Sequence, residues 1–160
     1  MRLLASLVTL SLVLVCAACG GSSPATTSVS QISTDTVGLR ELVPVVPADS
    51  AVVWSEQVVV KGGRLPAPSK VVLRARVALT TSGLQKLQND FAWQPQPAAT
   101  GGEIVSDVGV STGAESPLPI DGWMSSTMCD HAVADASTYH EVVVLFHPAT
   151  ATLVVRGEKD

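Results

Sequence analysis

Cysteine, aromatic residues and charged side chains are all scarce in this sequence of 160 residues. Three cysteines are too few for the disulfide framework of a small secreted scaffold, and two of them lie close together near the N-terminus. The ten Lys and Arg residues are outnumbered by fourteen Asp and Glu, for a formal net charge of −4. A chain of this charge lacks the basic surface that nucleic acid requires, so we expect no nucleic-acid partner.

Only one long hydrophobic run is present, and it lies at the N-terminus. Met1-Arg2 gives a short positive start, the segment 3–15 is apolar, and small residues follow before Gly20. A membrane-spanning helix needs about 20 apolar residues, so this run is too short to span. It predicts an export signal, residues 1–18, that is removed from the mature protein.

The end of this segment resembles the signal of bacterial lipoproteins, in which a small residue precedes a cysteine that receives a diacylglycerol. Ala18-Cys19 matches that pattern, whereas Cys16 as acceptor would place Val15 at the cleaved bond. The resemblance implies cleavage after Ala18, acylation of Cys19 as the only bound group, and extracytoplasmic localisation on the cell membrane through that lipid anchor. The alternative is an ordinary secretory signal cut at Ala18, which would leave Cys19 a free thiol.

Behind the signal, the sequence predicts a tether and one folded domain. The segment 19–47 combines a Ser- and Thr-rich stretch with Gly20, Gly21 and several prolines, a composition that does not bury enough surface to order itself. Within it, Val37 to Ala48 is expected to be an irregular lead-in that packs against the domain. Residues 48–160 are long enough for one domain with its own core.

The expected fold class is α+β: a small antiparallel sheet of about four strands with one helix packed on one face and a C-terminal β-hairpin. The alternation in Lys70–Thr80 places Lys70, Arg74 and Arg76 on one strand face, which we expect to be in water. The run 142–146 is apolar without alternation, as in a central strand covered on both faces. The predicted strands are Ala51–Val60, Lys70–Thr80, Tyr139–His147 and Ala151–Arg156.

Apolar residues at helical spacing predict a helix over Ser82–Phe91, with a capping box at Ser82 and Gln85. The segment from Gln94 to Trp123 is rich in Pro, Gly and Ser and predicts a long loop with one strand-like stretch, 103–110. Long loops in compact domains are often functional, so we expect this one to carry recognition. The pattern in 121–137 does not distinguish helix from loop.

One candidate site combines Met124, Met128, Cys129 and His131. Sulfur ligands beside an imidazole suit copper(I), and an unpaired cysteine in an exported chain also allows thiol chemistry. Methionine and cysteine are equally ordinary core residues, so packing is the competing interpretation. His140 and His147 are interpreted as surface or strand-end residues.

A hydrolase is the second alternative, because Ser125, Ser126, Asp130 and His131 lie close together in sequence. Proximity along the chain does not build a catalytic triad, whose members converge from separate elements. The sequence contains no nucleophile-elbow, phosphate-loop or zinc-helix motif. We therefore expect no enzyme and no catalytic residues. The favoured hypothesis is a membrane-anchored binding module that presents 94–123 to an envelope protein, a wall polymer or an incoming agent.

Overall fold

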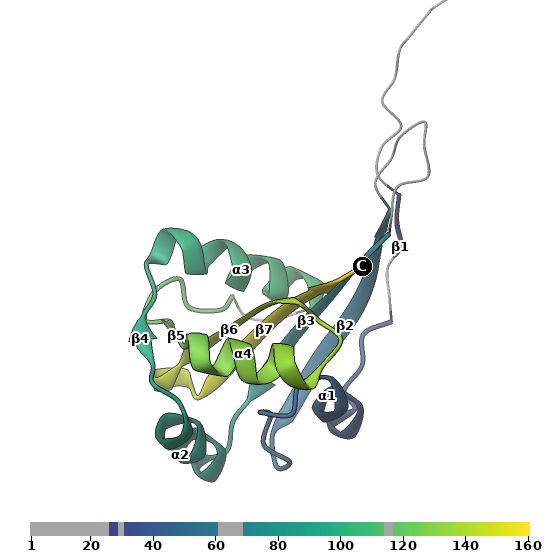
Figure 1. Ribbon diagram of the computed structural model, residues 1–160. Coiled ribbons are helices and arrows are strands. Elements are labelled where there is room, and N and C mark those ends of the chain that lie inside the picture. The colour runs from purple at the N-terminus through teal and green to yellow at the C-terminus, as the bar shows by residue number, and fades with distance from the viewer. Residues whose placement is uncertain (1–25, 29–30, 61–68, 114–116) are drawn as a thin grey trace, which may run out of the picture.

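The computed structural model describes residues 26–28, 31–60, 69–113 and 117–160. They form an α+β fold in which one antiparallel sheet carries helices on both faces (Figure 1). The predicted signal peptide and Cys19 lie outside the described residues. In chain order the elements are β1 (Thr26–Ser28), α1 (Thr36–Leu42), β2 (Ala51–Val60), β3 (Lys70–Ala78), α2 (Thr81–Asp90), β4 (Gln94–Pro95), α3 (Ala98–Ser111), β5 (Met124–Ser125), α4 (Thr127–Ala136), β6 (Glu141–His147), the 3-10 turn Pro148–Thr150 and β7 (Thr152–Lys159).

The strand order is β1-β2-β3-β7-β6-β5-β4, and every neighbouring pair is antiparallel. The four long central strands, β2, β3, β7 and β6, are the four that the sequence predicts, with ends that shift by a few residues. The predicted C-terminal hairpin is confirmed as β6–β7. The remaining strands, β1, β4 and β5, have only two or three residues, which is too short for a pattern of alternation.

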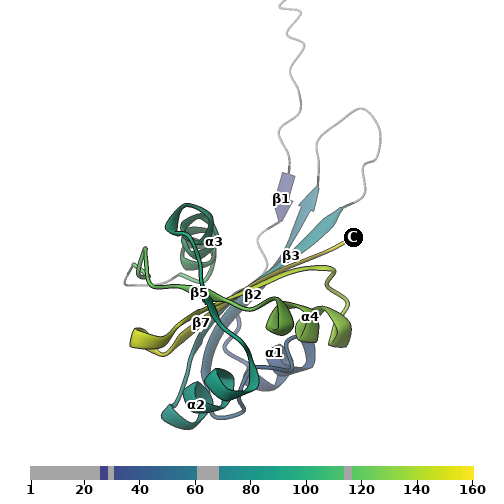
Figure 2. The same cartoon turned by 60° about the vertical axis from the view of Figure 1, so that its left-hand side comes forward.

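One face of the sheet, here called the three-helix face, is covered by α1, α2 and α4 (Figure 2). Leu39 of α1, Leu87 of α2 and Val133 of α4 are buried against inward-pointing strand residues such as Ala75 and Phe146. These side chains form the larger apolar core. Each helix contributes a narrow apolar stripe, so the packing against the sheet, rather than local propensity, stabilises these short helices.

The opposite face, here called the α3 face, carries α3 and a smaller apolar cluster (Figures 1 and 2). Val105 and Val108 pack on Leu145 and Val154, with Trp123 completing the cluster. The central strand β6 is thus covered on both faces, as predicted, because Leu145 and Phe146 point in opposite directions and are both 0% exposed.

Two expectations about helices are wrong. The described part of the chain has four α-helices rather than one, and the stretch 103–110, expected as a strand within a long loop, belongs to α3. Its Val residues and Gly101, Gly102 and Gly109 disfavour a helix locally, but Val105 and Val108 lie on one helical stripe and are buried. The ambiguous segment 121–137 contains α4, which Ser126 caps.

The helix predicted over Ser82–Phe91 is present as α2, but its cap differs. Thr80 is the N-cap, and its hydroxyl accepts a hydrogen bond from the amide of Gly83 at 3.2 Å. Ser82 instead donates its hydroxyl to Asp49 at 2.8 Å. The capping box predicted at Ser82 and Gln85 is therefore wrong, because two hydroxyl-bearing residues precede Ser82 and the first of them takes the capping position.

The segment expected as a tether and irregular lead-in is partly regular. Thr26–Ser28 pairs with Val58–Val60 of β2, and Ser33 forms an isolated bridge with Trp54. Asp35 caps α1 by accepting a hydrogen bond from the amide of Val37 at 3.0 Å. The core extends into this segment, since Leu39, Val43 and Val46 are 0–1% exposed.

Candidate functional site

The four residues predicted as a metal or thiol site lie at β5 and α4 but face different surroundings. Cys129 is 0% exposed in the core of the three-helix face, whereas Met128 is 52% exposed and His131 is exposed. Met124 is half-buried in β5. The structure does not gather these side chains, and the ranges that it describes contain no group of three or more His, Cys, Asp or Glu placed to hold a metal.

Burial also governs the chemistry of Cys129. Desolvation, assisted by the nearby charge of Asp130, raises the pKa of the Cys129 thiol to about 12. At neutral pH such a thiol is almost wholly protonated, and the protonated form is a poor nucleophile and a poor metal ligand. Cys129 is a free cysteine that packs as a core residue.

The residues of the hydrolase hypothesis have structural partners. Ser126 caps α4 by accepting from the amide of Cys129, and Ser125 donates to Gln96 Oε1 at 2.9 Å. Asp130 Oδ1 accepts from the amide of Val144 at 2.7 Å, which ties α4 to β6. Burial raises the pKa of Asp130, although the Val144 hydrogen bond opposes the shift. No hydrogen bond joins these serines to His131 within the described part of the chain.

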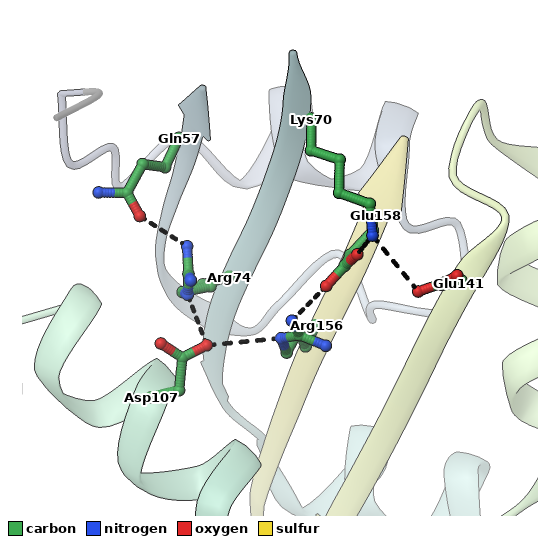
Figure 3. Close-up of polar contacts among 7 residues, drawn as sticks. All are labelled: Gln57, Lys70, Arg74, Asp107, Glu141, Arg156 and Glu158. Atoms are coloured by element: carbon green, nitrogen blue, oxygen red, sulfur yellow. Dashed lines mark hydrogen bonds and ion pairs between the residues drawn. The ribbon is translucent and has the colours of Figure 1, made fainter. Parts of the chain in front are cut away.

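Charged residues gather on the α3 face, where the sequence predicts a strand face in water. Figure 3 shows their side chains linked across α3, β3, β7 and β6. Asp107 of α3 accepts from Arg74 Nε at 2.7 Å and lies 3.5 Å from Arg156 Nε. We call this set the ion cluster; it consists of Lys70, Arg74, Asp107, Glu141, Arg156 and Glu158, with Gln57 at its margin.

The cluster is balanced in charge and partly buried. Arg74 is only 9% exposed and Glu158 6%, so the expectation that this strand face lies in water is wrong for Arg74, which α3 covers. The hydrogen bond from Lys70 holds the pKa of Glu158 below its ordinary value, and the same contact raises the pKa of Lys70. With its arginines paired to carboxylates, the cluster is suited to fixing α3 on the sheet.

A second polar group lies on the three-helix face at the middle of β2. Glu56 accepts hydrogen bonds from the buried hydroxyl of Tyr139 and from Lys159 Nζ, and the latter distance is 2.9 Å. Desolvation opposes ionisation of Glu56, but these two donors outweigh it and hold its pKa below the ordinary value. Burial, with the nearby Glu56 charge, raises the pKa of Tyr139. The phenol is thus protonated and acts as a structural donor.

A groove with polar side chains at its rim lies beside α1 and α2; we call it the α1–α2 groove. Its volume is about 500 Å³, within the range of small-molecule sites. The turn after α1 supplies Pro44 and Pro47, whose rings limit the backbone, and Phe91 and Ala132 add apolar surface from α2 and α4. The full lining is Arg40, Pro44, Val45, Val46, Pro47, Ala48, Asp49, Ser82, Gly83, Lys86, Asp90, Phe91 and Ala132.

The region expected to carry recognition, 94–123, is organised differently from a long loop. It contains β4 and α3, and it ends with Trp123, which is 2% exposed and donates its indole N–H to the carbonyl of Pro119 at 2.7 Å. Val110 and Ile120 are its most exposed large apolar residues, at 82% and 76%. Trp123 thus supports the apolar cluster of the α3 face.

Neither the groove nor Arg40 was among the sites predicted from the sequence. The sequence does contain a pattern that predicts α1, the helix that carries Arg40. Asp35 is a capping residue, and Leu39, Leu42 and Val43 follow it at helical spacing. This pattern predicts α1 and therefore places Arg40 on the helix surface next to the proline-containing turn.

Comparisons with protein-family models, curated proteins and solved structures find no match to this chain. Among the residues that the structure describes, no helix has the length and hydropathy needed to cross a membrane. The function has to be inferred from the residues themselves.

Proposed function

We propose that this protein is a non-enzymatic binding module that a lipid on Cys19 anchors at the outer side of the cell membrane. The observation that carries this proposal is the N-terminal sequence: a positive start, an apolar run too short to span, and Ala18-Cys19 at its end. A diacylglycerol supplies two acyl chains, and each buried methylene contributes about 0.8 kcal/mol, which is sufficient for stable attachment.

Binding rather than catalysis is supported by how the polar side chains are used. Ser126 and Asp130 hold α4 in place, and the thiol of Cys129 is buried and protonated. The α1–α2 groove combines apolar walls with a few charged residues, which is the usual character of a ligand site. An anchored module of this kind raises the effective concentration of its partner at the membrane.

Intact mass spectrometry of the protein extracted from membranes tests the anchor. We expect a mature chain that begins at Cys19 and carries the mass of a diacylglycerol. Cys19→Ala should remove the lipid mass. A Cys19→Ala chain from which the signal peptide has been cleaved should no longer attach to the membrane. The matched control is Cys16→Ala, which should leave both unchanged. A mature protein with an unmodified Cys19 would refute the proposal.

A further inference from the structure

The α1–α2 groove contains a positive charge without a carboxylate partner in the described ranges. Arg40 lines the groove, and the only hydrogen bond of its side chain to a described residue runs from Nε to the carbonyl of Val46 at 3.1 Å. This bond ties the guanidinium to the proline-containing turn and leaves its two terminal nitrogens available. Arginine is the side chain best suited to hold a carboxylate, because two parallel N–H groups match its two oxygens.

The other charges of the groove are already engaged. Lys86 Nζ and Asp90 form an ion pair at 2.6 Å. Asp49 Oδ2 accepts hydrogen bonds from Thr80 at 2.6 Å and from Ser82 at 2.8 Å, and these donors lower the pKa of Asp49. Asp49 is therefore ionised at neutral pH with its charge stabilised by the two hydroxyls. Arg40 remains as the charge that a ligand can neutralise.

We propose that the α1–α2 groove binds the carboxyl end of a short apolar peptide, with the terminal carboxylate on Arg40. The apolar side chain next to that carboxylate would lie on Pro44, Pro47 and Phe91. This proposal names the ligand of the binding module and so rests on the proposed function. A volume of about 500 Å³ accommodates two or three small residues.

The polar rim favours a peptide over a fatty acid, which carries a carboxylate on an equally apolar body. Lys86 keeps donor capacity beyond its bond to Asp90, and Asp49 Oδ1 accepts no hydrogen bond from another side chain in the described ranges. Peptide amides can use these donors and acceptors. A hydrocarbon chain makes no hydrogen bonds with these exposed groups, so the polar rim adds nothing to its binding.

Fluorescence anisotropy tests the proposal on the full mature protein held in lipid nanodiscs, so that no detergent competes for the groove. The probe is the peptide Ala-Ala-Leu with fluorescein at its N-terminus and a free C-terminal carboxylate. Its C-terminal amide is the matched control. Because the amide cannot form the charge-assisted hydrogen-bond pair with Arg40, we expect it to bind about tenfold to a hundredfold more weakly than the free acid.

Three variants locate the site. Arg40→Gln removes the charge and should lower the affinity for the free acid to that for the amide. Arg40→Lys should retain part of the difference in affinity between the two peptides. Ala132→Leu fills the groove from α4 without changing its charge and should weaken both peptides. Arg76→Gln is the matched control, because Arg76 is half-buried on the opposite face, beside a cavity of about 270 Å³.

Equal binding of acid and amide, or no saturable binding of either, would overturn the proposal. Displacement of the probe by decanoate at the concentration that suffices for unlabelled Ala-Ala-Leu would overturn the choice of a peptide. The intact mass of the same preparation reports the state of Cys19. A lipidated protein that does not bind therefore contradicts the ligand alone, and a protein without lipid contradicts the anchor.

Discussion

The two faces of the sheet are held by different interactions. The three-helix face buries a broad apolar core with residues from α1, α2 and α4, whereas the α3 face combines a small apolar cluster with an ion cluster. Apolar burial changes little with pH or salt, but ion pairs depend on both. We therefore expect pH and salt to affect the attachment of α3 more than any other part of this fold.

The largest expected effect comes from two adjacent residues of β6 that point to opposite faces. Phe146→Ala should lower the free energy of unfolding by about 3–5 kcal/mol, because it leaves a cavity in the larger core where Phe146 packs on Trp93. Leu145→Ala should cost about 2–3 kcal/mol, because the smaller α3 cluster can relax around it. Chemical denaturation measures both. Equal losses would show that the two faces do not differ in packing.

A smaller effect is expected from Asp107→Asn, which removes the carboxylate shared by Arg74 and Arg156. Because Asp107 is 38% exposed, the cost should be about 1–2 kcal/mol rather than that of a fully buried pair. Hydrogen exchange of α3 amides should accelerate while that of α2 does not. The matched control is Asp90→Asn at an exposed i,i+4 pair, which should cost about 0.3–0.5 kcal/mol. Uniform acceleration in both helices would contradict a separate role for the ion cluster.

The smallest expected effect is the pH dependence of the free energy of unfolding. The pKa of Glu158 is lowered from an ordinary value of 4.5, so its contribution to stability is complete above that value and is lost as pH falls through the lowered pKa. The loss should be about 1 kcal/mol or less. Thermal unfolding between neutral and acidic pH measures it, and Glu158→Gln should flatten the dependence. Glu56→Gln tests the corresponding contribution on the three-helix face, since the pKa of Glu56 is also lowered. If neither variant changes the slope, other carboxylates control acid unfolding.

The sequence predicted the elements whose local pattern agrees with their place in the fold. The central strands alternate or are wholly apolar, and α2 has a clean apolar stripe, so both could be found from side-chain spacing. By contrast, α3 contains valines and glycines that favour other structures, and only its burial between Leu145 and Trp123 makes it helical. The short strands β1, β4 and β5 are set by pairing with their neighbours, which a local pattern does not contain.

The candidate site, like α3 and the short strands, depends on tertiary contacts that local patterns do not contain. Met124, Met128, Cys129 and His131 are close in sequence, but a helix distributes consecutive residues around its axis and only Cys129 faces the core. The groove is built from α1, the turn after it, α2 and α4, which are distant in sequence. The role proposed for Arg40 depends on the packing of these elements, which residue spacing along the chain does not predict.

The pairing of β1 with β2 places β1 at the end of β2 that is distant from the groove. Thr26 lies opposite Val60, at the end of β2, whereas Asp49 of the groove lies two residues before the start of that strand at Ala51. A strand of ten residues extends about 33 Å, so Thr26 and the groove lie near opposite ends of β2. If Cys19 carries the proposed lipid, the anchor would thus join the sheet at the end of β2 that is distant from the groove.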